Sequence, residues 1–210
     1  MVDILAHRGL WKKNHEKNSI IAFKRAFDNG FGVETDVRDF KDEIVISHDI
    51  PSKNSKKLEE LFTTLESYSG DFKLALNVKS DGLSINLKRL IMSYNIQNYF
   101  FFDMSVPDHL NFIDQDLNTF SRVSEYENSH LLNSKVQGIW LDSFNSDWYN
   151  NESIQNLCSK DNEICIVSPE LHGRNHIPLW TMIREVSYII NNNISICTDF
   201  PIKAKEFFND

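Results

Sequence analysis

The strongest constraint on the fold is an alternation of short apolar runs with helical patterns, which continues from one end of the chain to the other. Most of the runs are β-branched or aromatic and apolar on both faces, as in a parallel sheet that is buried on both sides. Eight of them are predicted strands: residues 4–6, 32–37, 74–78, 99–104, 119–124, 138–141, 165–168 and 195–198.

Helical patterns separate these runs. In residues 19–29, Ile20, Phe23 and Phe27 recur with helical spacing, and Gly30 follows as a stop signal. Further helices are predicted at 55–69, 83–94 and 152–159, and after the prolines at 107, 178 and 201, which suit a first helical turn. There is no repeat, low-complexity stretch or linker, so we expect a single domain over residues 1–210.

Eight strand–helix units in one chain predict either a closed (β/α)8 barrel or an open, doubly wound sheet. No glycine-rich phosphate loop follows any predicted strand, which disfavours the open sheets that bind nucleotides. We therefore expect an α/β protein with the TIM-barrel fold. It would be a small barrel, since such domains usually have about 250 residues and this chain has 210.

Composition excludes several classes of protein. The chain has 30 acidic and 22 basic residues, a formal net charge of −8, so a nucleic-acid partner is not expected. The N-terminal apolar stretch is too short for a signal peptide, and no run is long enough for stable membrane insertion. Three cysteines with apolar neighbours indicate reduced thiols in a cytoplasmic protein, not a zinc site or a disulfide framework.

Polar residues stand at the end of every predicted strand, where the chemistry of such barrels takes place. They are His7, Arg8, Glu34, Asp36, Asn77, Lys79, Asp103, Ser124, Glu125, Asp142, Glu170, Thr198 and Asp199. Together they predict a polar mouth above an apolar barrel.

Glu34 and Asp36 are two residues apart on one strand, so their side chains point the same way. Two carboxylates on one face repel each other unless a cation joins them, and Mg²⁺ or Ca²⁺ is the natural occupant. The alternative is that one carboxylate faces a helix N-terminus while the other is solvated.

His48 follows a second short strand, at residues 44–46, and the polar residues 39–43 before it resemble a turn. An antiparallel hairpin with its loop at Asp42 and Glu43 would add a strand after the second one. His48 would then lie opposite Val37 and beside Asp36, where it could exchange a proton near neutral pH. The alternative is a packed residue at a strand end.

His7 and Arg8 end the first predicted strand, and Lys79 lies two residues after Asn77, facing the same side. Arginine suits a pair of phosphate oxygens, and lysine adds a point charge. Together with the carboxylates and His48, these residues supply the components of phosphoester cleavage: a metal site, an acid, a base and an anion clamp.

The order and spacing of these motifs resemble the glycerophosphodiester phosphodiesterase family. The resemblance rests on residues 6–9 (AHRG), Glu16, 18–23 (NSIIAF), 34–37 (ETDV), 44–49 (IVISHD), 77–79 (NVK) and 198–201 (TDFP). It covers the first 80 residues and the last strand, whereas residues 99–170 match only the rhythm of a barrel.

The resemblance implies a metal-dependent phosphodiesterase that acts on a small-molecule phosphodiester in lipid metabolism. In that family two histidines act as general acid and base while a neighbouring hydroxyl of the substrate attacks phosphorus, and water then opens the cyclic phosphate. The residues that match these roles are His7 and His48 for acid–base catalysis, Arg8 and Lys79 for phosphate binding, and Glu34, Asp36 and Asn77 for Mg²⁺ or Ca²⁺.

This chain departs from the family at two places. Asn77 stands where the family usually has a third carboxylate, and an amide brings no charge, so Asp103 is a candidate compensating ligand. The family also inserts a small subdomain after the His-Asp pair, for which this chain has no room.

The alcohol of the substrate and the oligomeric state stay open. Candidate residues of an alcohol pocket are Glu125, Asp142 and Glu170, with rim salt bridges or loop contacts as the alternative. Two other functions also stay open: a barrel without activity that binds a phosphorylated ligand or a sugar, and a lyase that releases a cyclic phosphate.

Overall fold

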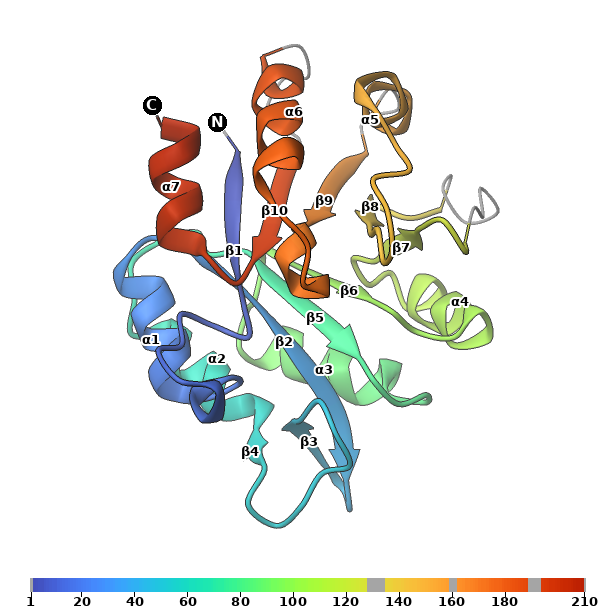
Figure 1. Ribbon diagram of the computed structural model, residues 1–210. Coiled ribbons are helices and arrows are strands. Elements are labelled where there is room, and N and C mark those ends of the chain that lie inside the picture. Colours follow the sequence, from blue (N-terminus) through green and yellow to red (C-terminus); the bar gives the residue numbers. More distant parts are fainter. Residues whose placement is uncertain (1, 128–134, 159–161, 189–193, 210) are drawn as a thin grey trace. The chain divides into compact units, whose positions relative to one another are not determined.

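The computed structural model describes residues 2–127, 135–158, 162–188 and 194–209 (Figure 1). The chain divides into two compact units. Unit 1 comprises residues 1–5 and 120–210, and unit 2 comprises residues 6–119. Strand β1 (Asp3–His7) contributes residues to both. The single domain expected from the sequence stays a prediction.

Unit 2 is built around a sheet whose centre is buried on both faces. Strands β2 (Gly32–Phe40), β5 (Leu74–Val78) and β6 (Tyr99–Phe102) pair in parallel, in that order. Strand β3 (Glu43–Ile46) lies antiparallel to β2, and the short β4 (Lys56–Lys57) pairs with β3. All five residues of β5 are buried, as its apolar sequence predicts.

The helices of unit 2 each follow a strand in the chain. Helix α1 (Ile20–Asp28) begins at Ser19, whose hydroxyl accepts a hydrogen bond from the Ala22 amide, and it buries one apolar stripe. The others are η1 (Asn14–Glu16), α2 (Leu58–Glu66), α3 (Ser84–Ser93) and α4 (Val106–Asp114). Helix α2 begins three residues later than predicted, because Lys56 and Lys57 pair with β3.

The strands of unit 1 that follow β6 in the chain also pair in parallel. Strands β10 (Ile194–Thr198), β9 (Glu163–Val167), β8 (Gly138–Leu141) and β7 (Phe120–Val123) pair in this order. The other elements are α5 (Asn151–Cys158), η2 (Pro169–His172), α6 (Ile177–Ser187) and α7 (Pro201–Asn209). The cysteines of this unit are buried thiols. In the described part of the chain, no helix combines the length and the hydropathy of a membrane span.

All eight predicted strands are confirmed, and so is the added hairpin, but its predicted register is wrong. Strand β2 continues to Phe40, and Val37 pairs with Ile46, not with His48. The reason is that Lys41 adopts a left-handed backbone (φ 59°), which closes a turn of two residues between Phe40 and Glu43. His48 therefore follows the end of β3 instead of pairing within it.

Candidate functional site

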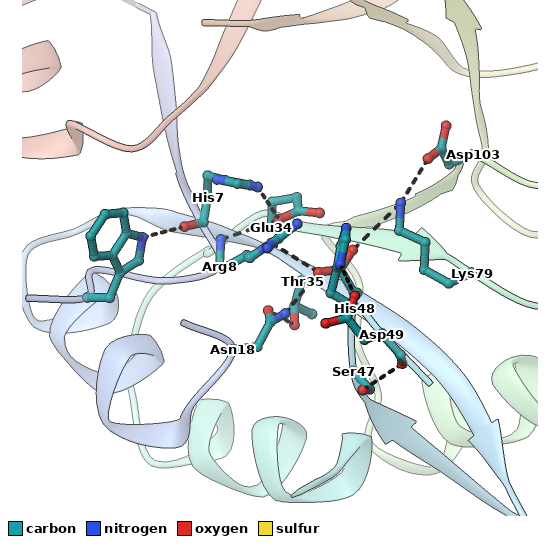
Figure 2. A network of polar contacts seen from close by, with 12 residues as sticks. His7, Arg8, Asn18, Glu34, Thr35, Ser47, His48, Asp49, Lys79 and Asp103 are labelled. Atoms are coloured by element: carbon teal, nitrogen blue, oxygen red, sulfur yellow. Dashed lines mark hydrogen bonds and ion pairs between the residues drawn. The ribbon is translucent and has the colours of Figure 1, made fainter. Parts of the chain in front are cut away.

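The structure gathers the predicted catalytic, phosphate-binding and metal-binding residues within unit 2, on its strands or shortly after them, and Figure 2 shows most of them. His7 is the last residue of β1 and Arg8 follows it, Glu34 and Asp36 lie on β2, and His48 follows β3. Asn77 lies on β5 with Lys79 directly after that strand, and Asp103 follows β6. The pairing of β2 with β5 sets Asp36 directly beside Asn77.

The carboxylates of Glu34 and Asp36 are both buried, with 2% and 0% of the residue exposed. Burial, followed by the neighbouring charge of Asp36, raises the pKa of Glu34 to about 7. The Arg8 amide donates to Glu34 Oε2 at 3.3 Å, and His7 Nε2 lies 3.8 Å from the same oxygen. Since neither carboxylate is solvated, the alternative of one solvated member is wrong.

The two oxygens of Asp36 differ in their surroundings. Oδ2 accepts a hydrogen bond from Asn18 Nδ2 at 2.8 Å and lies 3.1 Å from Arg8 Nε. Oδ1 is buried without a hydrogen bond from any described residue, and its ionic neighbour is Lys79 Nζ at 3.7 Å. Two contacts thus hold one oxygen of Asp36, whereas the other has no hydrogen-bond donor among the described residues and only the more distant ammonium of Lys79 beside it.

A divalent cation fits this arrangement. Asn77 Oδ1, on the strand position paired with Asp36, is also buried with no hydrogen-bond donor among the described residues. Two unpartnered oxygens beside the buried Glu34 carboxylate form the kind of hard oxygen set that Mg²⁺ and Ca²⁺ prefer. Within the described residues no group of three or more His, Cys, Asp or Glu side chains forms a metal site, so a third oxygen here would come from the Asn77 amide.

Asn18 belongs to the site, although the sequence indicated only that it is part of the motif at residues 18–23. Its side-chain amide accepts a hydrogen bond from Thr35 Oγ1 and donates one to Asp36 Oδ2, both at 2.8 Å. Its backbone N–H donates a hydrogen bond to the Arg8 carbonyl at 3.0 Å. Its backbone is left-handed (φ 58°), a conformation that asparagine tolerates well. The sequence signal for Asn18 was its position in residues 18–23, a motif that resembles one of the glycerophosphodiester phosphodiesterases.

The two histidines have different surroundings. The carbonyl of His7 accepts a hydrogen bond from Trp11 Nε1 at 3.2 Å, and its side chain is 14% exposed. The side chain of His48 is 46% exposed, and its Nδ1 lies 2.9 Å from Asp49 Oδ1. The contact with His48 lowers the pKa of Asp49. The exposure of His48 argues against the alternative of a packed strand-end residue.

The candidate pocket residues Glu125, Asp142 and Glu170 lie in unit 1, in hydrogen bonds within that unit. Glu125 accepts from the amides of residues 144 and 145, and Glu170 accepts from the Asp199 amide and two hydroxyls. Asp142 Oδ1 lies 2.8 Å from His172 Nε2. These contacts organise the strand ends of unit 1, and a pocket role for the three residues stays a prediction.

Comparison with solved structures identifies the fold. The chain superposes over its whole length on a Galdieria sulphuraria protein assigned to the glycerophosphodiester phosphodiesterases, with a TM-score of 0.81, 17% identity and 98% of that chain covered. The Agrobacterium tumefaciens glycerophosphodiester phosphodiesterase matches with a TM-score of 0.70 and 15% identity, over 100% of both chains.

An Oleispira antarctica phosphodiesterase, solved with its product sn-glycerol-3-phosphate, matches with a TM-score of 0.73 and 14% identity, over 99% of this chain and 97% of that one. Neither the protein-family models nor the curated proteins give a match to the sequence. At these identities the likeness establishes the fold, and the chain has the α/β barrel fold of the glycerophosphodiester phosphodiesterases.

Proposed function

We propose that this protein is a phosphoric diester hydrolase that cleaves a small, glycerophosphodiester-like substrate with the help of a divalent cation. The observation that carries the proposal is the polar cluster of unit 2, in which two buried carboxylates, two unpartnered oxygens and two cationic side chains meet. Fold likeness to the glycerophosphodiester phosphodiesterases supports it independently.

The phosphate would be held by Arg8 and Lys79. Both cations already lie beside Asp36, so the anionic substrate would enter a site where positive charge is fixed in position. Charge held in place before binding costs no reorganisation when more negative charge develops on phosphorus. Arginine offers a planar pair of donors for two phosphate oxygens, and lysine adds a point charge.

His7 and His48 would transfer the protons. One histidine accepts the proton of the substrate hydroxyl that attacks phosphorus, and the other donates a proton to the departing alcohol oxygen. This step forms a cyclic phosphate and releases the alcohol. In the second step water attacks the cyclic phosphate, and the two histidines exchange roles.

Glu34, Asp36 and Asn77 would hold the cation, Mg²⁺ or Ca²⁺, through their side-chain oxygens. Two of these oxygens, Asp36 Oδ1 and Asn77 Oδ1, accept no hydrogen bond from any described residue. When bound, such a cation polarises phosphoryl oxygens and stabilises the charge of the transition state. It would also relieve the repulsion between Glu34 and Asp36 that contributes to the raised pKa of Glu34.

The test is hydrolysis of glycerophosphodiesters by the purified protein, with Mg²⁺ or Ca²⁺ and with a chelator. We expect His7→Ala and His48→Ala to lower kcat by about 100-fold or more. His15→Ala is the matched control, because His15 is an exposed histidine on η1. Normal turnover by both variants, with their fold intact, would refute the assignment of the acid–base pair.

Product analysis separates the remaining functions. Phosphorus NMR that detects a terminal cyclic phosphate and no hydrolysis would assign a lyase. Binding of glycerol phosphate that a chelator does not affect, without turnover of any diester, would favour a barrel that only binds. A reducing compartment such as the cytoplasm would suit the three buried thiols of unit 1.

A further inference from the structure

Lys79 lies between two carboxylates of unit 2. Its Nζ donates a hydrogen bond to Asp103 Oδ2 at 3.1 Å (Figure 2). Asp36 Oδ1 lies 3.7 Å from the same Nζ, too far for a good hydrogen bond. The Asp36 side chain is 1% exposed and that of Asp103 is 14% exposed. Because charges attract more strongly away from water, Lys79 alone would be drawn to Asp36.

The position of Asp103 explains why Lys79 stays with it. Asp103 directly follows β6, and its backbone is left-handed (φ 75°), a conformation that residues with side chains adopt rarely. Unusual backbone conformations of this kind persist where the surrounding structure holds them, and they are frequent at functional sites. Here the turn after β6 places the carboxylate on the ammonium of Lys79.

We propose that Asp103 is a positioning residue for Lys79, an inference that rests on the proposed function. By pairing with the ammonium, Asp103 keeps it from closing onto Asp36 Oδ1. That oxygen, together with Asn77 Oδ1, then remains available to a divalent cation, and Lys79 stays where it can meet a phosphate. Although Asn77 is neutral, the site then contains three carboxylates and two cationic side chains. The carboxylates are those of Glu34, Asp36 and Asp103, and the cations are Arg8 and Lys79.

The first experiment is a crystal structure of the Asp103→Asn variant of the full chain. Asparagine tolerates the left-handed backbone, so the turn after β6 should survive. We expect Lys79 Nζ to move onto Asp36 Oδ1, at about 2.8 Å. If Lys79 keeps its position in the variant, Asp103 does not position it, and the proposal is overturned without reference to any activity.

The second experiment measures the affinity for Ca²⁺ and Mg²⁺ by calorimetry in a double-mutant cycle. We expect Asp103→Asn to weaken cation binding by about tenfold, because the lysine then neutralises Asp36. Lys79→Met should strengthen binding, and adding Asp103→Asn to Lys79→Met should change nothing further. Asp81→Asn is the charge control, since its carboxylate accepts from Ser105 Oγ instead.

The outcomes are distinct. If Asp103→Asn weakens cation binding equally in the Lys79→Met background, Asp103 acts on the cation directly and the positioning role is wrong. If Asp81→Asn weakens it as much as Asp103→Asn, the effect is one of net charge alone, which also overturns the proposal. If the wild-type protein binds neither cation at millimolar concentration, the proposed function loses its cation, while the crystal structure still decides the role of Asp103.

Discussion

Asn18 connects three segments of the site through hydrogen bonds. Its side-chain amide accepts a hydrogen bond from Thr35 and donates one to Asp36, and its backbone N–H donates one to the Arg8 carbonyl. These partners lie on the turn after β1 and on β2, the segments that contain the candidate functional residues Arg8 and Asp36. The role of Asn18 is therefore to hold this turn against β2.

Replacing Asn18 by alanine would leave the Thr35 hydroxyl and Asp36 Oδ2 each short of one hydrogen-bond partner in a buried place. We expect Asn18→Ala to lower the free energy of unfolding by about 1–3 kcal/mol, measured by urea denaturation. Asn14→Ala, at an exposed position on η1, is the matched control and should change it by less than about 0.5 kcal/mol. Equal stability of the two variants would contradict the role assigned to Asn18.

His109 is a second residue whose surroundings the sequence did not reveal. It lies buried on α4, with 6% of the residue exposed. Its Nε2 has no hydrogen-bond partner among the described residues. Burial lowers the pKa of His109 to about 4, so the histidine is neutral in the folded protein at neutral pH.

This depressed pKa makes stability depend on pH. In the unfolded chain His109 binds a proton below its ordinary pKa of 6.5, whereas in the folded protein it does so only near pH 4. The unfolded state therefore binds more protons between these values, and stability falls as the pH falls through this window, by about 3 kcal/mol at most. Urea denaturation of wild type and His109→Phe between pH 7.5 and pH 4.5 should show a smaller loss in the variant.

Glu34 has the opposite effect in the same window, because its raised pKa stabilises the folded state as the pH falls from 7 toward 4.5. Wild type and the His109→Phe variant both retain Glu34, so its contribution to the pH dependence of stability cancels in the comparison. His15→Phe, at an exposed position, is the control and should follow wild type. A His109→Phe profile parallel to that of wild type would refute the prediction.

At the scale of elements, the turn between β1 and α1 sets the position of His7 and Arg8. Arg8 and Gly9 are both left-handed (φ 57° and 82°), and the Leu10 amide donates to the Ala22 carbonyl at 2.9 Å. A Cβ added at Gly9 would lie 2.8 Å from the Ala22 carbonyl carbon. Only glycine allows this backbone to pass so close to α1.

Gly30 allows the cost of this contact to be separated from the cost of the backbone conformation. It is also left-handed (φ 79°), but a Cβ there would meet no described atom within 4 Å. We expect Gly30→Ala to cost about 1–2 kcal/mol of unfolding free energy and Gly9→Ala distinctly more, because α1 must shift. Thermal or urea denaturation checks this, and similar losses in the two variants would contradict the close packing at Gly9.

Most elements could be predicted from the sequence because their signals are local. The apolar runs of β5 and β8 lie in the strands that they predict, and Ser19 begins α1 as its side chain indicates. The register of the β2–β3 hairpin could not be predicted, since one left-handed residue, Lys41, moves the turn and shifts the pairing by two positions. The sequence carries no signal for it, because glycine, asparagine and aspartate are the residues that usually adopt this conformation, and lysine is not among them.

At the scale of the whole molecule, the chain forms two compact units that share strand β1. Residues 3–5 of this strand belong to unit 1, and residues 6 and 7, with the candidate catalytic His7, belong to unit 2. Since one continuous strand contributes residues to both units, unfolding of either unit would disrupt a strand that the other unit also contains.

We therefore expect unfolding in a single cooperative transition, in keeping with one domain. Of the four tryptophans, Trp11 lies in unit 2 and the others lie in unit 1. In a Trp11→Phe variant the fluorescence reports on unit 1, while circular dichroism reports on both units. Coincident midpoints in urea would confirm cooperative unfolding, and two separate transitions would show that the units fold independently.

The sequence by itself determined the order of strands and helices, the barrel class and the identity of the residues that gather at the strand ends of unit 2. These depend on local periodicity and on the rule that parallel strands end at the same edge of a sheet. Only the tertiary structure decided that Asp36 Oδ1 and Asn77 Oδ1 are buried without donors among the described residues, and that Lys79 pairs with Asp103. Burial and pairing of this kind depend on strand register and side-chain packing across segments far apart in the chain, which no local pattern encodes.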